Sequence, residues 1–455
     1  MKNIILSAAC AALLSSCGLY GKYKPAKEVP EGLYGEEVVI TDSSSIADIS
    51  WREMFTDAKL QALIDTALVR NVDYKTTQLR VKQAEAAMIP AKLAYLPSLA
   101  IAPQGGYNYV DINGGVTTKT YTAPASASWE LDFFGKLTSA KRKAQATLEQ
   151  TRDYEQAVKT QLIAGVATTY YSLLMLDDQL KIAEETKANW EQTVKTARAM
   201  KKAGMMNEAG LAQTEATYYN ISTTVLTLKE SVNEAQNTLC LLLAKTPQYI
   251  DRGSLSEAVL PENISVGVPV SVLSRRPDVR AAEHALEAAF YDTNKARASF
   301  YPQISLSGTA GWTNSVGSAI MNPGEFIGSA LLSLVQPIFN RGALVANLKA
   351  MKAGQEIALL EFKKSILKAG SEVNLALDKY QTAKAKTEFY TKQVASLETA
   401  VKSTQLLMKH GSTTYLEVLT AQTTLLNARL NQVSNKFVEI QGMIELYRSL
   451  GGGQD

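Results

Sequence analysis

Residues that could carry out chemistry are few in this 455-residue chain, and they lie far apart. His284 and His410 are its only histidines, and they fall in different halves of the sequence. Cys240 stands in the apolar run Leu239 to Leu243, where a small buried hydrophobe is the ordinary explanation for a cysteine. A catalytic triad or a zinc site needs several such groups to converge. We therefore expect no enzyme, no catalytic residue and no metal site.

Cys17 is the one cysteine that is placed for chemistry. It follows Leu14-Ser15-Ser16 and a short apolar run, the order of a secretory signal, so residues 1–16 are expected to be a signal peptide. The L-S-S-C order resembles a bacterial lipobox, whose cysteine is lipidated and becomes the mature N-terminus. An ordinary signal with an incidental cysteine is the alternative. The only cofactor expected is this covalent lipid on Cys17, with palmitate among its acyl chains.

Charge and hydropathy exclude two classes of protein. The formal net charge is +3, and Lys and Arg are interleaved with Asp and Glu along the chain, which is no nucleic-acid footprint. The chain after Cys17 contains no run of about 18 apolar residues, the minimum for a transmembrane helix. If the chain spans a membrane, it must do so as strands.

The sequence carries an internal repeat at domain scale. The stretches WELDFFGKL (129–137) and VQPIFNRGAL (335–344) each end a strand-like pattern and lead into a long helical one. Pro97 and Pro302 are as far apart as Phe134 and Phe339 (302 − 97 = 339 − 134 = 205). One offset at two landmarks predicts two copies of one unit, each a helix, a strand pair, a long helix, a turn and a second long helix.

This repeat predicts the organisation of the chain. In order, we expect a signal peptide (1–16), a lipidated extended segment (17–50), a first repeat (51–244, with its strand pair at about 97–132), an irregular segment (245–272), a second repeat (273–450, with its strand pair at about 302–338) and a tail (451–455).

The predicted strands alternate with period two. From Tyr121 the odd positions are mostly small and apolar and lead to Trp129, and after Pro302 the even positions do the same as far as Trp312. The other face of both strands is rich in hydroxyl groups. Alternation fits either a sheet with a core on one side or a transmembrane barrel with lipid outside and a lumen inside. Because four strands cannot close a barrel, the second interpretation requires oligomerisation.

The long helices show a sustained seam with spacings of 3 and 4, typical of a coiled coil. The seam positions are Leu416, Leu419, Thr423, Leu426, Leu430, Val433, Phe437, Ile440, Ile444 and Tyr447, and in the first repeat Tyr218, Ile221, Val225, Leu228, Val232, Ala235, Leu239 and Leu242. The partner helices are expected to end near Met200 and His410, with Gly204 and Gly411 as left-handed C-caps. At some 65 residues each would be about 100 Å long.

These stretches together resemble the outer-membrane efflux protein family, the TolC/OprM-like channel subunits, in its lipoprotein branch. Singly each is weak, but their order and spacing are specific. The stretches that match are Trp51-Arg52-Glu53-Met54-Phe55 with Asp57, Trp129 to Gly135, Arg275-Arg276-Pro277-Asp278-Val279, Ala298-Ser299-Phe300-Tyr301-Pro302, Pro337-Ile338-Phe339 and Leu450-Gly451-Gly452-Gly453.

The resemblance implies a fold that is mainly α with a small β part. It implies a homotrimer in which each protomer gives four strands to a transmembrane β-barrel and its coiled-coil helices to a periplasmic α-barrel. It also implies a lipid-anchored outer-membrane protein reaching into the periplasm, a passive exit duct for drugs or other small molecules. The implied partners are outer-membrane lipid, a periplasmic membrane-fusion adaptor and an inner-membrane pump of the resistance-nodulation-division type, the machinery of multidrug resistance.

The resemblance also suggests candidate sites. Glu417 and Thr420 fall at the two positions of the family's periplasmic constriction, where acidic side chains favour cations, although Thr420 is not acidic. Glu417 could equally be a solvated glutamate on a helix surface. The turns at Gly204 and Gly411 are candidates for adaptor docking, and Trp129 and Trp312 for the aromatics at the barrel's membrane interfaces.

One alternative to a channel remains, and one motif has a structural explanation. A lipid-anchored periplasmic coiled-coil scaffold without a pore would also explain the seams, with the strands packed as an ordinary soluble domain. In RRPDV, Pro277 at a helix start with Asp278 in the first turn predicts a structural helix entry and not a reactive group.

Overall fold

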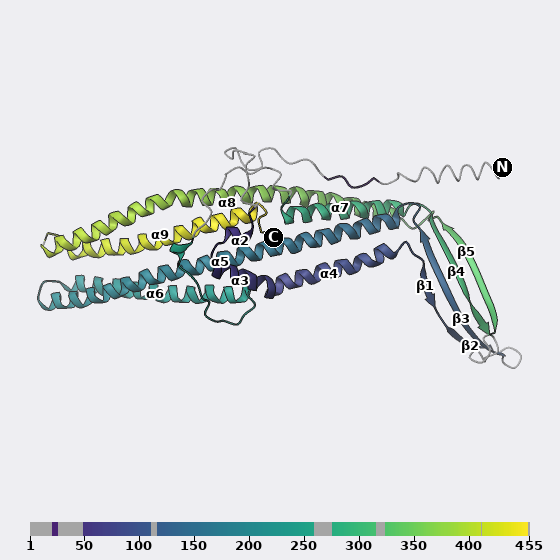
Figure 1. The fold of residues 1–455 in the computed structure, drawn as a ribbon, viewed down its shortest axis with the longest axis horizontal. Helices are drawn as coiled ribbons and strands as arrows, with labels where there is room; N and C mark the ends of the chain where they lie inside the picture. The colour runs from purple at the N-terminus through teal and green to yellow at the C-terminus, as the bar shows by residue number, and fades with distance from the viewer. Residues whose placement is uncertain are drawn as a thin grey trace. The chain divides into compact units, whose positions relative to one another are not determined.

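The computed structural model describes residues 21–25, 49–110, 116–258, 275–314, 324–410 and 412–453. The chain divides into two compact units (Figure 1). The sheet unit comprises Met1–Lys27, Leu79–Arg152 and Ala281–Lys364, and the turn unit comprises Glu28–Gln78, Asp153–Arg280 and Ser365–Asp455. Each unit draws on both sequence repeats, so the repeats are not the compact units.

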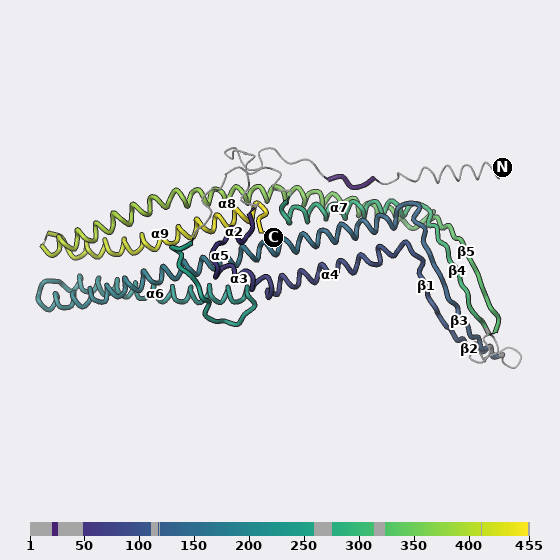
Figure 2. Tube along the Cα trace, in the orientation of Figure 1, coloured from purple at the N-terminus to yellow at the C-terminus, as the bar shows by residue number. Residues whose placement is uncertain are grey.

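The helices reproduce the repeat with near-identical lengths (Figure 2). Helices α5 and α8 have 67 residues each, and α6 and α9 have 35 each, with one offset of 207 (343 − 136 = 415 − 208). The helices of the described chain are α2 (Trp51–Met54), α3 (Ala58–Arg70), α4 (Val72–Leu93), α5 (Lys136–Lys202), α6 (Glu208–Leu242), α7 (Pro277–Ala298), α8 (Ala343–Lys409) and α9 (Tyr415–Ser449), with a 3-10 turn at Leu255–Glu257. None of them combines the length and apolarity that a membrane-spanning helix needs.

The strands form one antiparallel sheet in the order β1-β3-β4-β5, with β2 also on β3. Their bounds are β1 (Ser98–Ile101), β2 (Gln104–Val110), β3 (Val116–Leu131), β4 (Gln303–Asn314) and β5 (Glu325–Val335). Strands β1 and β2 follow one another along the same edge of β3, separated at Ala102 and Pro103, because a proline has no N–H to donate to the ladder. The first predicted strand is therefore in two pieces, and the sheet has four strand positions.

The register of the sheet places apolar residues of β3 opposite apolar residues of β4, and hydroxyl residues opposite hydroxyl residues. Across β3 and β4, Ala125 lies opposite Ala310 and Trp129 opposite Leu306, while Ser126 lies opposite Thr309. Because side chains alternate between faces along a strand, this register carries the apolar positions of both repeats to one face and the hydroxyl groups to the other.

The stretch WELDFFGKL joins β3 to α5 by contacts that explain its residues. The Trp129 indole N–H donates to the carbonyl of Tyr95 at 2.8 Å. Asp132 caps α5, because its two carboxylate oxygens accept from the backbone N–H groups of Leu137 and Thr138 at 2.9 and 2.7 Å. Gly135, with φ +71°, supplies the left-handed residue where the chain turns into the helix.

The second junction contains two additional residues. Phe134 and Phe339 are 205 apart, but Gly135 and Gly342, both with positive φ, are 207 apart (342 − 135). The extra residues are Asn340 and Arg341, so the repeat changes its offset at the point where strand gives way to helix.

The predicted seams face their partner helices in the turn unit. Trp190 of α5, Ile221 of α6, and Leu419 and Leu426 of α9 form one buried cluster. Further along α9, Ile440, Ile444 and Tyr447 are also buried. Leu416, the first residue of the α9 seam, is an exception, since 59% of it is exposed.

The first and last described residues of the turn unit pack together around Tyr447. The Tyr447 hydroxyl donates to the carbonyl of Ile49 at 3.0 Å, and its ring meets the ring of Phe55 edge-on. The carbonyl of Gly453 accepts from the side-chain amide of Gln156 at 3.1 Å. Gly452 lies against the Tyr447 ring, and a Cβ atom there would come within 2.4 Å of a ring carbon.

We predict that Gly452→Ala destabilises the chain, because the new methyl group would have to displace the buried Tyr447 ring. Overpacking of this kind costs about 1–3 kcal/mol. Gly165→Ala is the matched control, since nothing lies within 4 Å of a Cβ at that helical position. Thermal unfolding followed by circular dichroism should give a lower midpoint for the first variant and an unchanged or higher one for the second. Equal midpoints would contradict the packing described for Tyr447.

Candidate functional site

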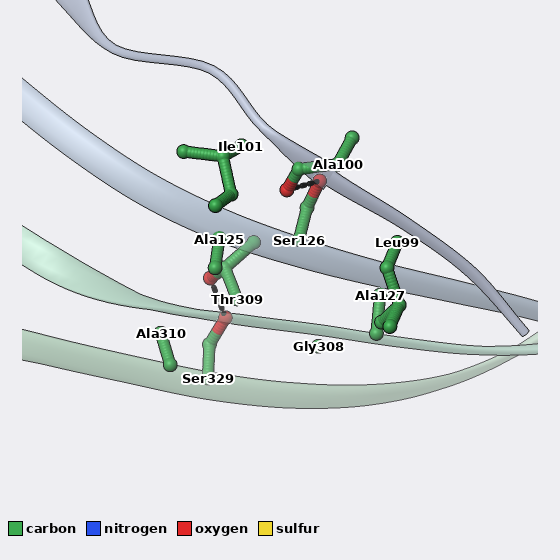
Figure 3. A pocket seen from close by; sticks show the side chains of 10 residues that line it. All are labelled: Leu99, Ala100, Ile101, Ala125, Ser126, Ala127, Gly308, Thr309, Ala310 and Ser329. Carbon is green, nitrogen blue, oxygen red and sulfur yellow. Dashed lines mark hydrogen bonds between the residues drawn. The ribbon is translucent and has the colours of Figure 1, made fainter.

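The apolar face of the sheet is uncovered in the single chain. Leu99 and Ile101 of β1 are 80% and 77% exposed, and Leu332 of β5 is 67% exposed. Beside Leu99 and Ile101 lies a groove of about 550 Å³, whose lining includes Ala125, Ala127, Gly308 and Ala310 (Figure 3). A monomeric soluble protein rarely exposes a contiguous apolar surface of this kind.

Aromatic side chains mark both ends of this apolar face. Trp129 lies at the end next to the helices, while Trp312, opposite Ala123, lies near the other end beside Tyr121. The ring of Trp312 meets that of Phe326 edge-on at 5.9 Å. Six to eight residues of β3 separate the two ends (129 − 123 and 129 − 121), which is about 20–27 Å of strand. The outward apolar band of an outer-membrane barrel is about 25 Å tall between its aromatic girdles.

The opposite face carries hydroxyl groups that bond to one another and to the backbone (Figure 3). The Thr309 and Ser329 side chains lie 2.7 Å apart, and the Ser126 hydroxyl donates to the carbonyl of Ala100 at 3.4 Å. Strand β5 departs from this pattern. By register its Ile327 and Leu331 lie opposite Gly311 and Ser307, on the hydroxyl face.

The two outer edges of the sheet are open. In the part of the chain that the structure describes, β1 and β2 pair only with β3, and β5 pairs only with β4. Each edge therefore presents a row of backbone N–H and C=O groups that can pair with another strand.

The turn between α5 and α6 has the C-cap that the sequence predicts. Gly204 has φ +74°, its N–H donates to the carbonyl of Lys201, and the N–H of Met205 donates to the carbonyl of Met200 at 2.9 Å. This pair of bonds is the Schellman motif. Gly411 lies outside the described residues, although across it the N–H of Ser412 donates to the carbonyl of Leu407 at 2.9 Å.

The two candidate constriction residues lie on the first turns of α9. Glu417 is exposed, and its carboxylate accepts a hydrogen bond from the Thr413 hydroxyl. The Thr420 hydroxyl is bonded to its own helix, at the carbonyl of Leu416. Of the two positions, only Glu417 therefore presents a negative charge.

Cys17, the predicted lipidation site, lies outside the described residues.

Arg276 of the RRPDV stretch is the centre of a buried ion cluster, which fits the structural role that the sequence predicts. Its side chain is 5% exposed and holds the Asp278 carboxylate at 2.9 and 2.7 Å. The same guanidinium donates to Glu372 of α8 at 2.7 Å and to the carbonyl of Ser449, the last residue of α9, at 3.0 Å. One side chain thus joins the start of α7 to two other helices.

A second polar contact of the turn unit centres on Asp57, the N-cap of α3. Its carboxylate accepts from the Tyr170 hydroxyl at 2.6 Å, and that hydroxyl in turn accepts from the N–H of Gly253. Burial, and then the hydrogen bond to Asp57, raises the pKa of Tyr170, so the phenol stays protonated as a donor.

In the described residues, no three His, Cys, Asp or Glu side chains are grouped as a metal site.

The repeat, the seams and the two-faced sheet agree with a known family. The model of the outer membrane efflux protein family matches residues 63–245 and 268–452. This chain belongs to that family. It is accordingly an outer-membrane protein of a transport family, and the two matched segments correspond to the two repeats.

Similar proteins align with the chain over nearly its whole length. It is 29% identical over 452 residues to the cation efflux system protein CusC of Escherichia coli K12, covering 98% of each chain. It is 30% identical over 422 residues to the pyoverdine export outer membrane protein OpmQ of Pseudomonas putida KT2440, covering 90% of this chain and 89% of OpmQ.

Solved structures show the same fold. The outer membrane channel MtrE of Neisseria gonorrhoeae, in its open state, matches with a TM-score of 0.86 at 26% identity, covering 96% of this chain and 99% of MtrE. A crystal structure of CusC matches with a TM-score of 0.85 at 28% identity, covering 96% of this chain and 100% of CusC. The mainly α architecture with a small β part is thus confirmed as that of outer-membrane efflux channels.

We predict that Arg276→Met destabilises the turn unit by about 2–3 kcal/mol, because Asp278 and Glu372 would lose their common partner. Removing one member of a fully buried ion pair costs about 3–5 kcal/mol, and the partial exposure of both carboxylates lowers this value. Lys368→Met is the control, since that exposed ammonium group lies 3.8 Å from the same Glu372. Urea unfolding should separate the two variants, and equal losses would contradict the role of Arg276.

The effect of Arg276→Met should depend on pH. Burial raises the pKa of Asp278, but the hydrogen bonds and charge of Arg276 outweigh this and hold that pKa below its usual range. The ionised carboxylate therefore stabilises the fold above the ordinary carboxyl range, and this contribution is lost as the pH falls through the lowered pKa. The difference in midpoint between wild type and variant should narrow below about pH 4. A difference that stays constant to pH 3 would contradict the ion pair.

Proposed function

We propose that the chain is the outer-membrane subunit of a tripartite efflux system and that three copies form a passive exit duct for drugs or other small molecules. The observation that carries the proposal is the sheet: one apolar face bounded by aromatics, one hydroxyl-rich face, and two open edges. An apolar face about 20–27 Å tall fits lipid, and a hydroxyl-rich face fits a water-filled lumen.

The open edges support a homotrimer. Within hydrocarbon an unpaired backbone group costs several kcal/mol, so the edge formed by β1 and β2 must pair with another strand. The outer edge of β5 is the available partner, and it belongs to the next copy. Head-to-tail pairing of this kind closes into a ring when the rotation between copies allows it. Three copies with four strand positions each would give twelve.

The N-terminal segment supports a lipid anchor on Cys17. Tyr23 lies on α7, where its ring meets Phe290 edge-on at 5.8 Å and its N–H donates to the Tyr291 hydroxyl at 3.4 Å. Cys17 is only six positions before Tyr23 (23 − 17), so the lipid is held within about 20 Å of that contact. Helix α7 continues for eight residues beyond Phe290, about 12 Å, and then leads into β4. The tether is thus long enough to reach the membrane-facing strands.

The two turns support docking to partners. We propose that the α5–α6 turn at Gly204 and the α8–α9 turn at Gly411 contact a periplasmic membrane-fusion adaptor, which connects the duct to an inner-membrane pump of the resistance-nodulation-division type. The names of similar proteins refer to cations, pyoverdine, antibiotics and toluene. Such varied cargo on one fold supports a duct that leaves selection of the cargo to the pump.

A scaffold without a pore is the alternative from another class. It would share the coiled-coil seams and the lipid anchor, and its sheet would stand in water. The exposed Leu99, Ile101 and Leu332 argue against this alternative, because a scaffold would leave them without cover.

Conductance in planar bilayers tests the duct and the role of Glu417 together. We predict discrete conducting steps for the purified protein, with a preference for cations, because three copies of Glu417 around one axis attract them. Glu417→Ala should lower the permeability ratio of K⁺ to Cl⁻ by roughly two-fold or more. The control is Glu388→Ala, which removes an exposed carboxylate from the other helix, α8. It should leave the permeability ratio unchanged.

Two outcomes would overturn these proposals separately. A conducting protein whose ion preference is the same with and without Glu417 would remove Glu417 from the constriction and keep the duct. A folded monomer that stays soluble without detergent after Cys17→Ala, and that never conducts, would leave the scaffold as the explanation.

A further inference from the structure

A cavity of about 660 Å³ in the turn unit is lined by residues from both helix turns. Met200, Met205 and Met206 belong to the α5–α6 turn, and Met408 belongs to the last turn of α8. Tyr415 also lines the cavity and packs against the buried cluster around Trp190, so the helix core forms one of its sides.

Packing does not explain every methionine in this cavity. The chain has 11 methionines, and four of them line this one cavity. Met205 is 73% exposed, so burial is no reason for its presence. The repeat offset of 207 places Ser412 and Thr413 in the other turn at the positions of Met205 and Met206 (412 − 205 = 413 − 206). The other turn therefore carries no methionine at these two corresponding positions.

The other lining residues leave the thioethers as the dominant ligand chemistry. None of the residues that line the cavity has a charged side chain, so a hard cation such as Mg²⁺ or Ca²⁺ would find no carboxylate. The Asn207 side chain is already engaged, because it accepts from the N–H of Gly210 at 2.8 Å as the N-cap of α6. Met206 covers this first turn of α6, with its sulfur 3.6 Å from the position of a Gly210 Cβ. Thioether sulfur is a soft ligand that selects d¹⁰ cations such as Cu⁺.

We propose that this methionine-lined cavity binds a soft monovalent cation, Cu⁺ or its analogue Ag⁺, through the sulfur atoms of methionines from both turns. Such a cation would link the α5–α6 turn to the end of α8. This site goes beyond the proposed duct, because cation binding to the purified chain requires no pore. A failure to bind the cation is therefore distinguishable from a failure to conduct.

The test is equilibrium binding of Ag⁺ to the purified full chain in detergent, with bound metal counted by mass spectrometry. All variants carry Cys240→Ala, because a thiol is itself a soft ligand. The site variant combines Met206→Leu with Met408→Leu, which preserves apolar character and nearly preserves volume. The matched control is Met175→Leu with Met351→Leu, one methionine of α5 and one of α8, both outside the cavity.

We expect the control to bind one tightly held Ag⁺ per chain and the site variant to bind it at least ten-fold more weakly. Equal binding by both variants would overturn the proposal, and it would leave the methionines as an adaptable apolar surface for a protein partner. Absence of tight Ag⁺ binding in the control would overturn it as well.

Discussion

The sheet has four strand positions and an open edge on each side. A sheet of this width cannot close on itself, and its backbone groups must be paired wherever lipid replaces water. From Tyr121 to Leu131 of β3 and from Ile304 to Trp312 of β4, the register carries the alanines and the large apolar side chains to one face and the serine and threonine hydroxyl groups to the other. The pairing between copies that we propose rests on these two facts together.

Local contacts at the strand-to-helix junctions set where the long helices begin, and polar contacts in the turn unit hold distant segments together. Asp132 caps α5 and Gly135 turns the chain, so the direction of the helix is set within a few residues of the strand. Beyond the sheet unit, Arg276 and Asp57 join segments that are distant in sequence through buried polar contacts. Buried ion pairs stabilise little in net terms, but each requires its partners in one geometry. The contribution of these contacts is to fix which segments meet in the turn unit.

The spacing of apolar residues predicted most of the helices and strands, because that spacing is a property of each element by itself. The seams of α6 and α9 follow from a 3.5-residue period, and the two faces of β3 and β4 follow from a period of two. The repeat offset was predicted correctly at Phe134 and Phe339, but the two extra residues at Asn340 and Arg341 shift every later position. Periodicity was weaker for β5, where Ile327 and Leu331 lie on the hydroxyl face.

Features that depend on contacts between distant segments could not be predicted. Nothing in the sequence near Asp57 indicates Tyr170, and nothing near Met206 indicates Met408, because each pair meets only after the helices have packed. The resemblance supplied Glu417 as a candidate, and the structure adds its exposed position on the first turn of α9. Glu417 can act at a constriction only if neighbouring copies surround one axis, so its role depends on the oligomer.

The number of copies in a detergent-solubilised particle decides whether the sheet edges pair between chains. Native mass spectrometry of the full chain carrying Cys17→Ala would count the copies in each particle without relying on the lipid anchor. We expect three copies per particle and loss of solubility when the detergent is removed, because the apolar sheet face would then meet water. A folded single copy that remains soluble without detergent would contradict the account, since its sheet edges and apolar face would need no partner.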